Sequence, residues 1–303
     1  MHQNISNLSS GNTSLPILHK FVLIDGVKMF YRECGPCEAP VILLLHGFPS
    51  SSRMFLNLFP LLSSRYRLIA PDYPGFGHSD TLPPEKFKYT FDHLSACIEH
   101  FLSKINVNRY TLYLQDYGGP IGFRIATSHP ERVTALIIQN AVIHIEGLSD
   151  SWTIRKAFWE DRVSLEEKMR EALLSREAAQ QRHLAGVAKP ECIDPDTWND
   201  EFCFLTRPGM VDIQLELMFD YQTNVAAYPR WQTYLRKKRP PMLVVWGKHD
   251  PLFTLAGAMA LSREVPDSEI HLLNASHFAL DEEAELIAEL IQRFIGKRFP
   301  TGI

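Results

Sequence analysis

The stretch LQDYGGP (Leu114 to Pro120) places a carboxylate between an apolar strand-like run and an apolar helix-like run. A tight strand-to-helix turn of the pattern G-x-S-x-G lifts a serine nucleophile clear of a sheet. Asp116 stands at the position of that serine, Leu114 replaces the first glycine, and Gly118 and Gly119 let the helix start close to the strand. Since aspartate is already an anion at neutral pH, it can displace a leaving group from an sp³ carbon without a base. An aspartate at this place is also typical of a helix N-cap, the plainer alternative.

Three further strand-like runs are followed directly by polar groups of the kind found in active sites. His46-Gly47-Phe48-Pro49 follows VILLL, Asp250 follows MLVVW and three further residues, and His277 follows EIHLL and three further residues. In an open parallel sheet, side chains at the carboxyl ends of the strands meet along one edge, where ligands bind. We therefore expect these groups to lie close to Asp116.

Short apolar runs alternate with amphipathic stretches along most of the chain. Continuous apolar runs separated by helices predict an α/β fold with a mostly parallel sheet covered by helices on both faces. Asp25-Gly26 predicts a hairpin turn between the first two strands. The expected strands are 18–24, 27–33, 41–45, 66–70, 110–114, 134–139, 242–246 and 269–273, and the expected helices include 51–62, 91–103 and 120–128.

One long segment contains no strand-like run. Residues 145–238 are charged, helical in period and rich in large aromatic side chains, and strands resume at Met242. The pattern predicts a helical cap at 145–238, inserted between two strands of a core formed by 17–144 and 239–303. Residues 1–16 are expected to form a flexible polar tail.

Taken together, these motifs resemble the α/β-hydrolase superfamily, and within it the branch with an aspartate nucleophile, haloalkane dehalogenases and epoxide hydrolases. The resemblance rests on five motifs that occur in the family's order across almost the whole chain, namely HGFP at 46–49, PDYPGFGHSD at 71–80, QDYGG at 115–119, GKHDP at 247–251 and SHF at 276–278.

The resemblance implies a role for each strand-end group. Asp116 would form an alkyl ester with the substrate, and His277 would activate the water that cleaves it. Asp250 would hold His277 in one tautomer and stabilise its cation. The backbone N–H groups of Phe48 and Tyr117 would form the oxyanion hole.

The substrate remains open between two classes. We favour dehalogenase-like activity, because Gln115-Asp116 resembles the dehalogenases. The positions at which that family binds the halide carry Phe48 and Tyr117 here, so Trp152 or Trp159 would have to bind the halide. The alternative is an epoxide hydrolase, in which Tyr221 and Tyr228, two helical turns apart, would protonate the ring oxygen. Both tyrosines also suit core packing. Asn140 cannot serve as the acid of the triad and is expected to line the pocket.

The composition and net charge argue against two classes of function, nucleic-acid binding and membrane insertion. A net charge of −4 and the absence of long basic runs disfavour nucleic acid, and no run reaches the roughly 20 apolar residues of a membrane span. We expect a cytoplasmic monomer or homodimer that acts on a small apolar organic substrate with water, and needs no metal or other cofactor. A non-catalytic binding protein of the same fold is the alternative from another class.

Overall fold

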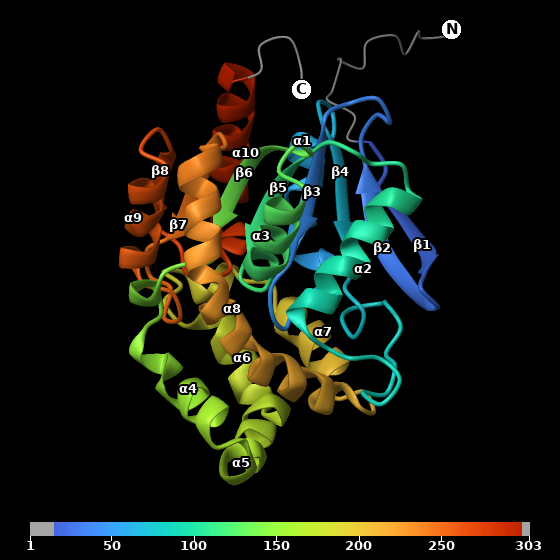
Figure 1. Ribbon diagram of the computed structural model, residues 1–303, viewed down its shortest axis with the longest axis vertical. Helices are drawn as coiled ribbons and strands as arrows, with labels where there is room; N and C mark the ends of the chain where they lie inside the picture. The colour runs from blue at the N-terminus through green and yellow to red at the C-terminus, as the bar shows by residue number, and fades with distance from the viewer. Residues whose placement is uncertain (1–14, 299–303) are drawn as a thin grey trace, which may run out of the picture.

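A single eight-stranded sheet forms the centre of the protein, described by a computed structural model for residues 15–298 (Figure 1). The strand order is β1-β2-β4-β3-β5-β6-β7-β8. Strand β2 is antiparallel to both of its neighbours, β1 and β4, and the pairs from β4 to β8 are parallel. The strands are β1 (Leu18–Ile24), β2 (Val27–Cys34), β3 (Val41–Leu45), β4 (Arg67–Pro71), β5 (Tyr110–Gln115), β6 (Val133–Gln139), β7 (Met242–Gly247) and β8 (Glu269–Leu273). The predicted fold class is confirmed.

The central strands are apolar along their whole length because both faces of the sheet are covered. In β3, Leu43 and Leu45 pack into one hydrophobic core, whereas Ile42 and Leu44 pack into the core on the opposite face. Burial on both faces removes the alternation of polar and apolar residues that a one-sided sheet would show. This explains why the strand positions could be predicted from continuous apolar runs.

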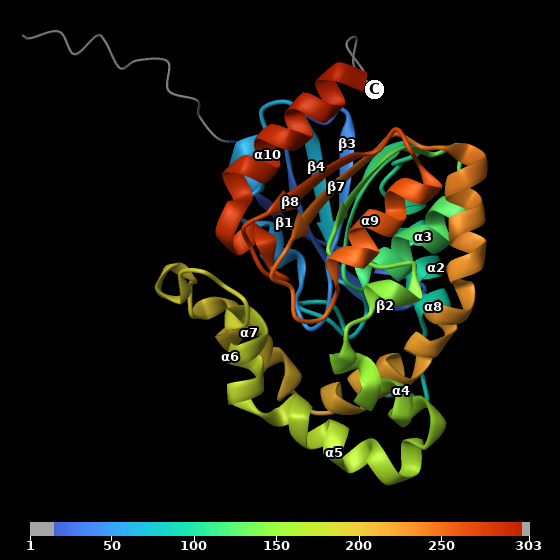
Figure 2. The same ribbon diagram turned by 90° about the vertical axis from the view of Figure 1, so that its left-hand side faces the viewer.

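Helices form a layer on each side of the sheet and a third group beyond its carboxyl edge (Figure 2). One core contains side chains of α2, α3, α8 and α9, and the other contains side chains of α1 and α10. The α-helices are α1 (Phe59–Leu62), α2 (Phe91–Lys104), α3 (Gly118–Ser128), α4 (Thr153–Glu160), α5 (Arg162–Leu174), α6 (Arg176–Leu184), α7 (Asp196–Leu205), α8 (Met210–Lys238), α9 (Leu255–Glu264) and α10 (Ala279–Arg298).

The hairpin between β1 and β2 has the predicted turn, with Asp25 and Gly26 both at positive φ. The prediction of a single helix at 51–62 is wrong. It is divided into a 3-10 turn at Ser52–Phe55 and the short α1. Ser51 caps the first turn through its side chain, and Pro60, which lacks an N–H, lies in the first turn of α1, where no intrahelical donor is required.

Between β6 and β7 the chain forms helices joined by loops and no further strand of the sheet, and α4 to α7 lie below the carboxyl ends of the strands in Figure 1. The last helix of this segment, α8, runs from there up the side of the core. Its C-terminal part packs on α3, where the rings of Trp231 and Phe123 stack with centroids 5.7 Å apart. Residues 145–238 are called the cap below, although the C-terminal end of α8 packs on the core. The tail expected at 1–16 lies, except for its last two residues, outside the described part of the chain.

No helix between residues 15 and 298 combines the length and the apolar character needed to cross a membrane.

Candidate active site

The turn between β5 and α3 presents Asp116 in a constrained backbone conformation. Asp116 has a φ of 47°, a left-handed value that is rare for residues other than glycine and is typical of functional turns. The turn is held close to its neighbours: a Cβ on Gly118 would lie 2.0 Å from the carbonyl oxygen of Leu45, and one on Gly47 would lie 2.4 Å from the Cβ of Asp116. Glycines at both positions therefore allow β3, the turn and the loop after β3 to meet.

The Asp116 carboxylate is buried and receives main-chain N–H groups. Phe48 N donates to Oδ1 at 2.7 Å, and the Tyr117 N–H also favours the charged form. Burial raises the pKa of Asp116, and His277 and these two N–H groups oppose the rise. Two N–H donors thus hold the carboxylate on one side, where they would stabilise negative charge. On the other side the carboxylate faces His277, with 3.9 Å between Asp116 Oδ2 and His277 Nε2.

His277 and Asp250 form a buried pair behind Asp116. The Nδ1 of His277 lies 2.8 Å from Asp250 Oδ2, and Asp250 Oδ1 accepts the N–H groups of Leu252 and Phe253. Burial lowers the pKa of His277, but Asp250 and Asp116 outweigh it and raise the pKa above its ordinary value. With Nδ1 bound to a carboxylate, Nε2 faces Asp116 as a proton acceptor.

Two amide side chains complete this arrangement. Asn140, at the end of β6, donates through Nδ2 to Asp250 Oδ2 at 2.7 Å and accepts the Gly247 N–H. Asn140 therefore positions Asp250. The sequence predicted that Asn140 lines the cavity, but it is not among the lining residues. Gln115 Nε2 lies 3.0 Å from His277 Nε2. No role for the Gln115 side chain could be predicted, because its orientation at a strand end does not follow from the sequence pattern.

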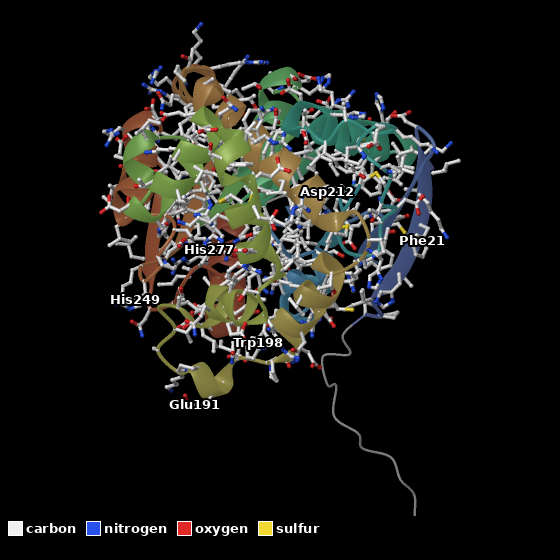
Figure 3. All side chains as sticks on the ribbon, turned by 90° about the horizontal axis from the view of Figure 1, so that it is seen from below. Phe21, Glu191, Trp198, Asp212, His249 and His277 are labelled. Atoms are coloured by element: carbon white, nitrogen blue, oxygen red, sulfur yellow. The ribbon has the colours of Figure 1, made fainter. Side chains whose placement is uncertain are left out.

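A cavity of about 350 Å³ lies between these groups and the cap. Seen from the cap side, His277 lies inside the molecule, whereas the neighbouring His249 lies at the edge (Figure 3). Of the site residues expected from the sequence, Asp116, His277, Phe48, Tyr117, Trp152 and Tyr221 line the cavity. Its other lining residues are Arg155, Ala172, Ala178, Gln181, Arg182, Met218, Pro251, Leu252 and Phe278.

The indole N–H groups of the two cap tryptophans already have acceptors. Trp152 Nε1 donates to the carbonyl oxygen of Leu252 at 3.1 Å, and Trp159 Nε1 donates to that of Met218 at 2.8 Å. Trp159 also lies outside the cavity lining and stacks on Tyr221. Neither indole is free to bind a halide in this structure.

The two cap tyrosines differ in position. Tyr221 lines the cavity, and its hydroxyl pairs with the hydroxyl of Tyr228. Burial, together with Tyr228 and Asp116, raises the Tyr221 pKa well above its usual value, so the hydroxyl stays protonated at neutral pH. Tyr228 is buried behind it and lies outside the cavity lining, and within residues 15–298 its hydroxyl has no partner other than Tyr221. Tyr221 is therefore the cap hydroxyl that can reach a bound molecule.

A second buried charge cluster joins the cap to the core next to His277. His183 on α6 lies 2.8 Å from Glu201 on α7 and 3.4 Å from Asp281 on α10, measured from its Nε2 and Nδ1. Its ring stacks on Phe278 at 4.1 Å. Burial lowers the pKa of His183, but the two carboxylates outweigh burial and raise it to about 9. His183 is therefore a cation at neutral pH.

We expect His183 to make stability depend on pH above neutrality. Because its folded pKa of about 9 exceeds the ordinary value of 6.5, the stabilisation is complete below pH 6.5 and is lost as the pH rises through 9. The loss should approach about 3 kcal/mol, the free-energy equivalent of that shift. Urea unfolding between pH 6.5 and 10 should show this decline in the native protein and not in His183→Gln. Equal slopes in the two proteins would contradict the prediction.

Within residues 15–298, no group of three or more His, Cys, Asp or Glu side chains is arranged to hold a metal ion.

Comparison with known proteins places these features in context. The model of the alpha/beta hydrolase fold family matches residues 40–284. An uncharacterized hydrolase of Saccharomyces cerevisiae is 40% identical over 277 residues, covering 90% of this chain and 95% of its own. An epoxide hydrolase 2 of Caenorhabditis elegans is 27% identical, covering 92% and 80%. A haloalkane dehalogenase of Psychrobacter cryohalolentis is 25% identical, covering 89% and 88%.

Proposed function

Because the chain belongs to the α/β-hydrolase fold family and its relatives are hydrolases, we propose that this hydrolase opens epoxides through an ester of Asp116. The observation that carries the proposal is that Tyr221, which has a proton to donate, lines the same cavity as the Asp116 carboxylate. An epoxide oxygen leaves as an alkoxide and needs a proton, whereas a halide does not. The two cap indoles, which would serve a halide, donate to main-chain carbonyls instead.

In the first step, Asp116 Oδ2 attacks one oxirane carbon and the bond from that carbon to the ring oxygen breaks. The oxygen takes the Tyr221 proton, which leaves a tyrosinate and a hydroxyalkyl ester of Asp116. The Tyr221 hydroxyl is protonated at neutral pH and can transfer its proton to the alkoxide, which is the more basic oxygen.

In the second step, water attacks the ester carbonyl carbon of Asp116. His277 Nε2 takes the water proton, and Asp250 stabilises the resulting imidazolium at 2.8 Å. Charge on the ester oxygen is stabilised by the N–H groups of Phe48 and Tyr117. The intermediate collapses to the Asp116 carboxylate and a diol, and the proton on His277 restores the Tyr221 hydroxyl through solvent. The net reaction is addition of one water to the epoxide.

Tyr221→Phe tests this assignment directly. The change removes the proton donor and keeps the ring that packs between Trp152 and Phe91. We expect kcat/KM for a neutral epoxide to fall on the order of 10²- to 10⁴-fold, the range of general acid catalysis. Diol formation measured by chromatography gives the result. Tyr228→Phe removes a hydroxyl that lies outside the cavity lining, and it should have the smaller effect. Equal activity of Tyr221→Phe and the native protein would rule out Tyr221 as the acid.

Haloalkane hydrolysis is the second candidate, supported by the similarity to the Psychrobacter haloalkane dehalogenase over most of both chains. The same variant separates the two reactions, since displacement of bromide needs no proton. Bromide release from a bromoalkane should be unchanged in Tyr221→Phe if the protein is a dehalogenase. Bromide release by the native protein without any diol formation from a panel of epoxides would favour this second candidate.

A further inference from the structure

The cap places two arginine side chains in the wall of the active-site cavity. Arg155 comes from α4 and Arg182 from α6, and both line the cavity that contains Asp116. Each lies against an aromatic ring of the same wall: the Arg182 guanidinium carbon is 5.7 Å from the centroid of Phe48, and that of Arg155 is 5.2 Å from the centroid of Trp152. Two cations thus share one small aromatic cavity.

Neither arginine has an anionic partner among residues 15–298. No carboxylate there lies within 4.0 Å of either guanidinium, whereas Arg162, Arg170 and Arg236 of the cap have such partners. The Nε and Nη2 atoms of Arg182 are buried without any hydrogen bond. Buried guanidinium nitrogens are costly unless they are paired, and residues 15–298 supply no partner for these two atoms of Arg182.

The surrounding charges make the missing partner an anion. Burial lowers the pKa of Arg182, and Arg155 lowers it further, against the opposing effect of Glu201. Glu201 itself is bound to His183 at 2.8 Å, so it does not neutralise the arginines.

We propose that the substrate carries a carboxylate that binds Arg182 and Arg155 while its oxirane carbon faces Asp116. This inference rests on the proposed function and names its substrate class, the epoxy acids. The planar fork of arginine matches a carboxylate through paired N–H groups. The positive charge of the arginines also offsets the repulsion between an anionic substrate and the Asp116 carboxylate. The carboxylate is unchanged in the reaction.

Paired substrates and variants test the proposal. Phenylglycidate carries the carboxylate, and phenylglycidamide replaces it with a neutral group of similar size. We expect Arg182→Met to lower kcat/KM for the acid on the order of 100-fold, as for loss of a buried charged hydrogen bond, and to change the value for the amide less than about two-fold. Arg182→Lys should restore part of the loss. Arg176→Met removes an exposed arginine from the same helix and should change neither value.

A binding measurement separates this inference from the proposed chemistry. Phenylcyclopropanecarboxylate has no reactive ring oxygen, and its binding to the native protein by calorimetry should be lost in Arg182→Met and kept in Arg176→Met. Binding of this type without turnover of any epoxide would support the carboxylate site and defeat the proposed function. Turnover of the amide without preference for the acid, or equal loss on both substrates in Arg182→Met, would overturn the carboxylate site alone. Melting curves should show Arg182→Met folded and at least as stable as the native protein, because it removes an unpaired buried charge.

Discussion

Replacing Asp116 with alanine is expected to abolish epoxide turnover, lowering kcat by about 10⁴-fold or more. The variant keeps His277, Asp250 and Tyr221, but it has no nucleophile to form the carbon–oxygen bond of the ester. The water that His277 would activate is directed at the ester carbonyl and not at an oxirane carbon, so the remaining groups have no alternative route. Diol formation under single-turnover conditions, with enzyme in excess, gives the measurement. Turnover within ten-fold of the native rate would mean that Asp116 is not the nucleophile.

The same carboxylate is expected to destabilise the fold. Burial raises the pKa of Asp116, which means that the charged form is less favourable in the folded than in the unfolded protein. Asp116→Asn removes the charge, keeps the side-chain volume and tolerates the left-handed φ of 47°. Its urea midpoint at neutral pH should therefore rise.

Asp250→Asn provides the opposite control for this stability effect. The Asp250 carboxylate accepts hydrogen bonds from Asn140, Leu252 and Phe253 and binds His277. Removing its charge should lower the urea midpoint, since charged hydrogen bonds contribute more than neutral ones. A lower midpoint in both variants would contradict the view that Asp116 is kept for chemistry at a cost in stability.

The strands and the strand-end groups were predictable because local pattern and three-dimensional position coincide there. A parallel strand buried on both faces is a continuous apolar run, and its carboxyl end has a fixed place at one edge of the sheet. Asp116, Asp250 and His277 could therefore be expected near one another from sequence alone. The helix expected at 51–62 failed because Pro60 starts a new turn where periodicity alone suggests continuity.

For the cap, the sequence does not show which side chains face the cavity. Arg155 shares its helix with the exposed Lys156, and Arg182 shares its helix with the exposed Arg176. Nothing in the spacing indicates which of these cations face the cavity. Tyr221 and Tyr228 share a helix face, as their spacing indicates, but only Tyr221 reaches the cavity lining. Which indole N–H is free depends on carbonyl groups of Leu252 and Met218, whose positions are set by the tertiary fold.

A His277→Ala variant is expected to stop after the first step and accumulate the Asp116 ester. His277 takes no part in the attack on the oxirane carbon, whereas the water of the second step has no other base within the triad. Steady-state turnover should fall on the order of 10³-fold or more, while the intact mass should increase by that of one whole epoxide, carried on the peptide that contains Asp116. A bromoalkane would instead add only its alkyl group, so the mass also distinguishes the two candidate reactions.

His249→Ala is the matched control for this trapping experiment. His249 lies next to Asp250 in the sequence, but its ring is exposed and contacts Asn274 rather than Asp250 or Asp116. This variant should turn over at the native rate and retain no adduct, because its second step is intact. An adduct in both variants would show that ester hydrolysis is slow for reasons other than the loss of the base. Full turnover by His277→Ala would require another base, and Gln115, which lies 3.0 Å from His277 Nε2, has an amide that cannot accept a proton from water at neutral pH. Accumulation in His277→Ala alone would therefore assign the water-activating step to His277 and the ester to Asp116 in one experiment.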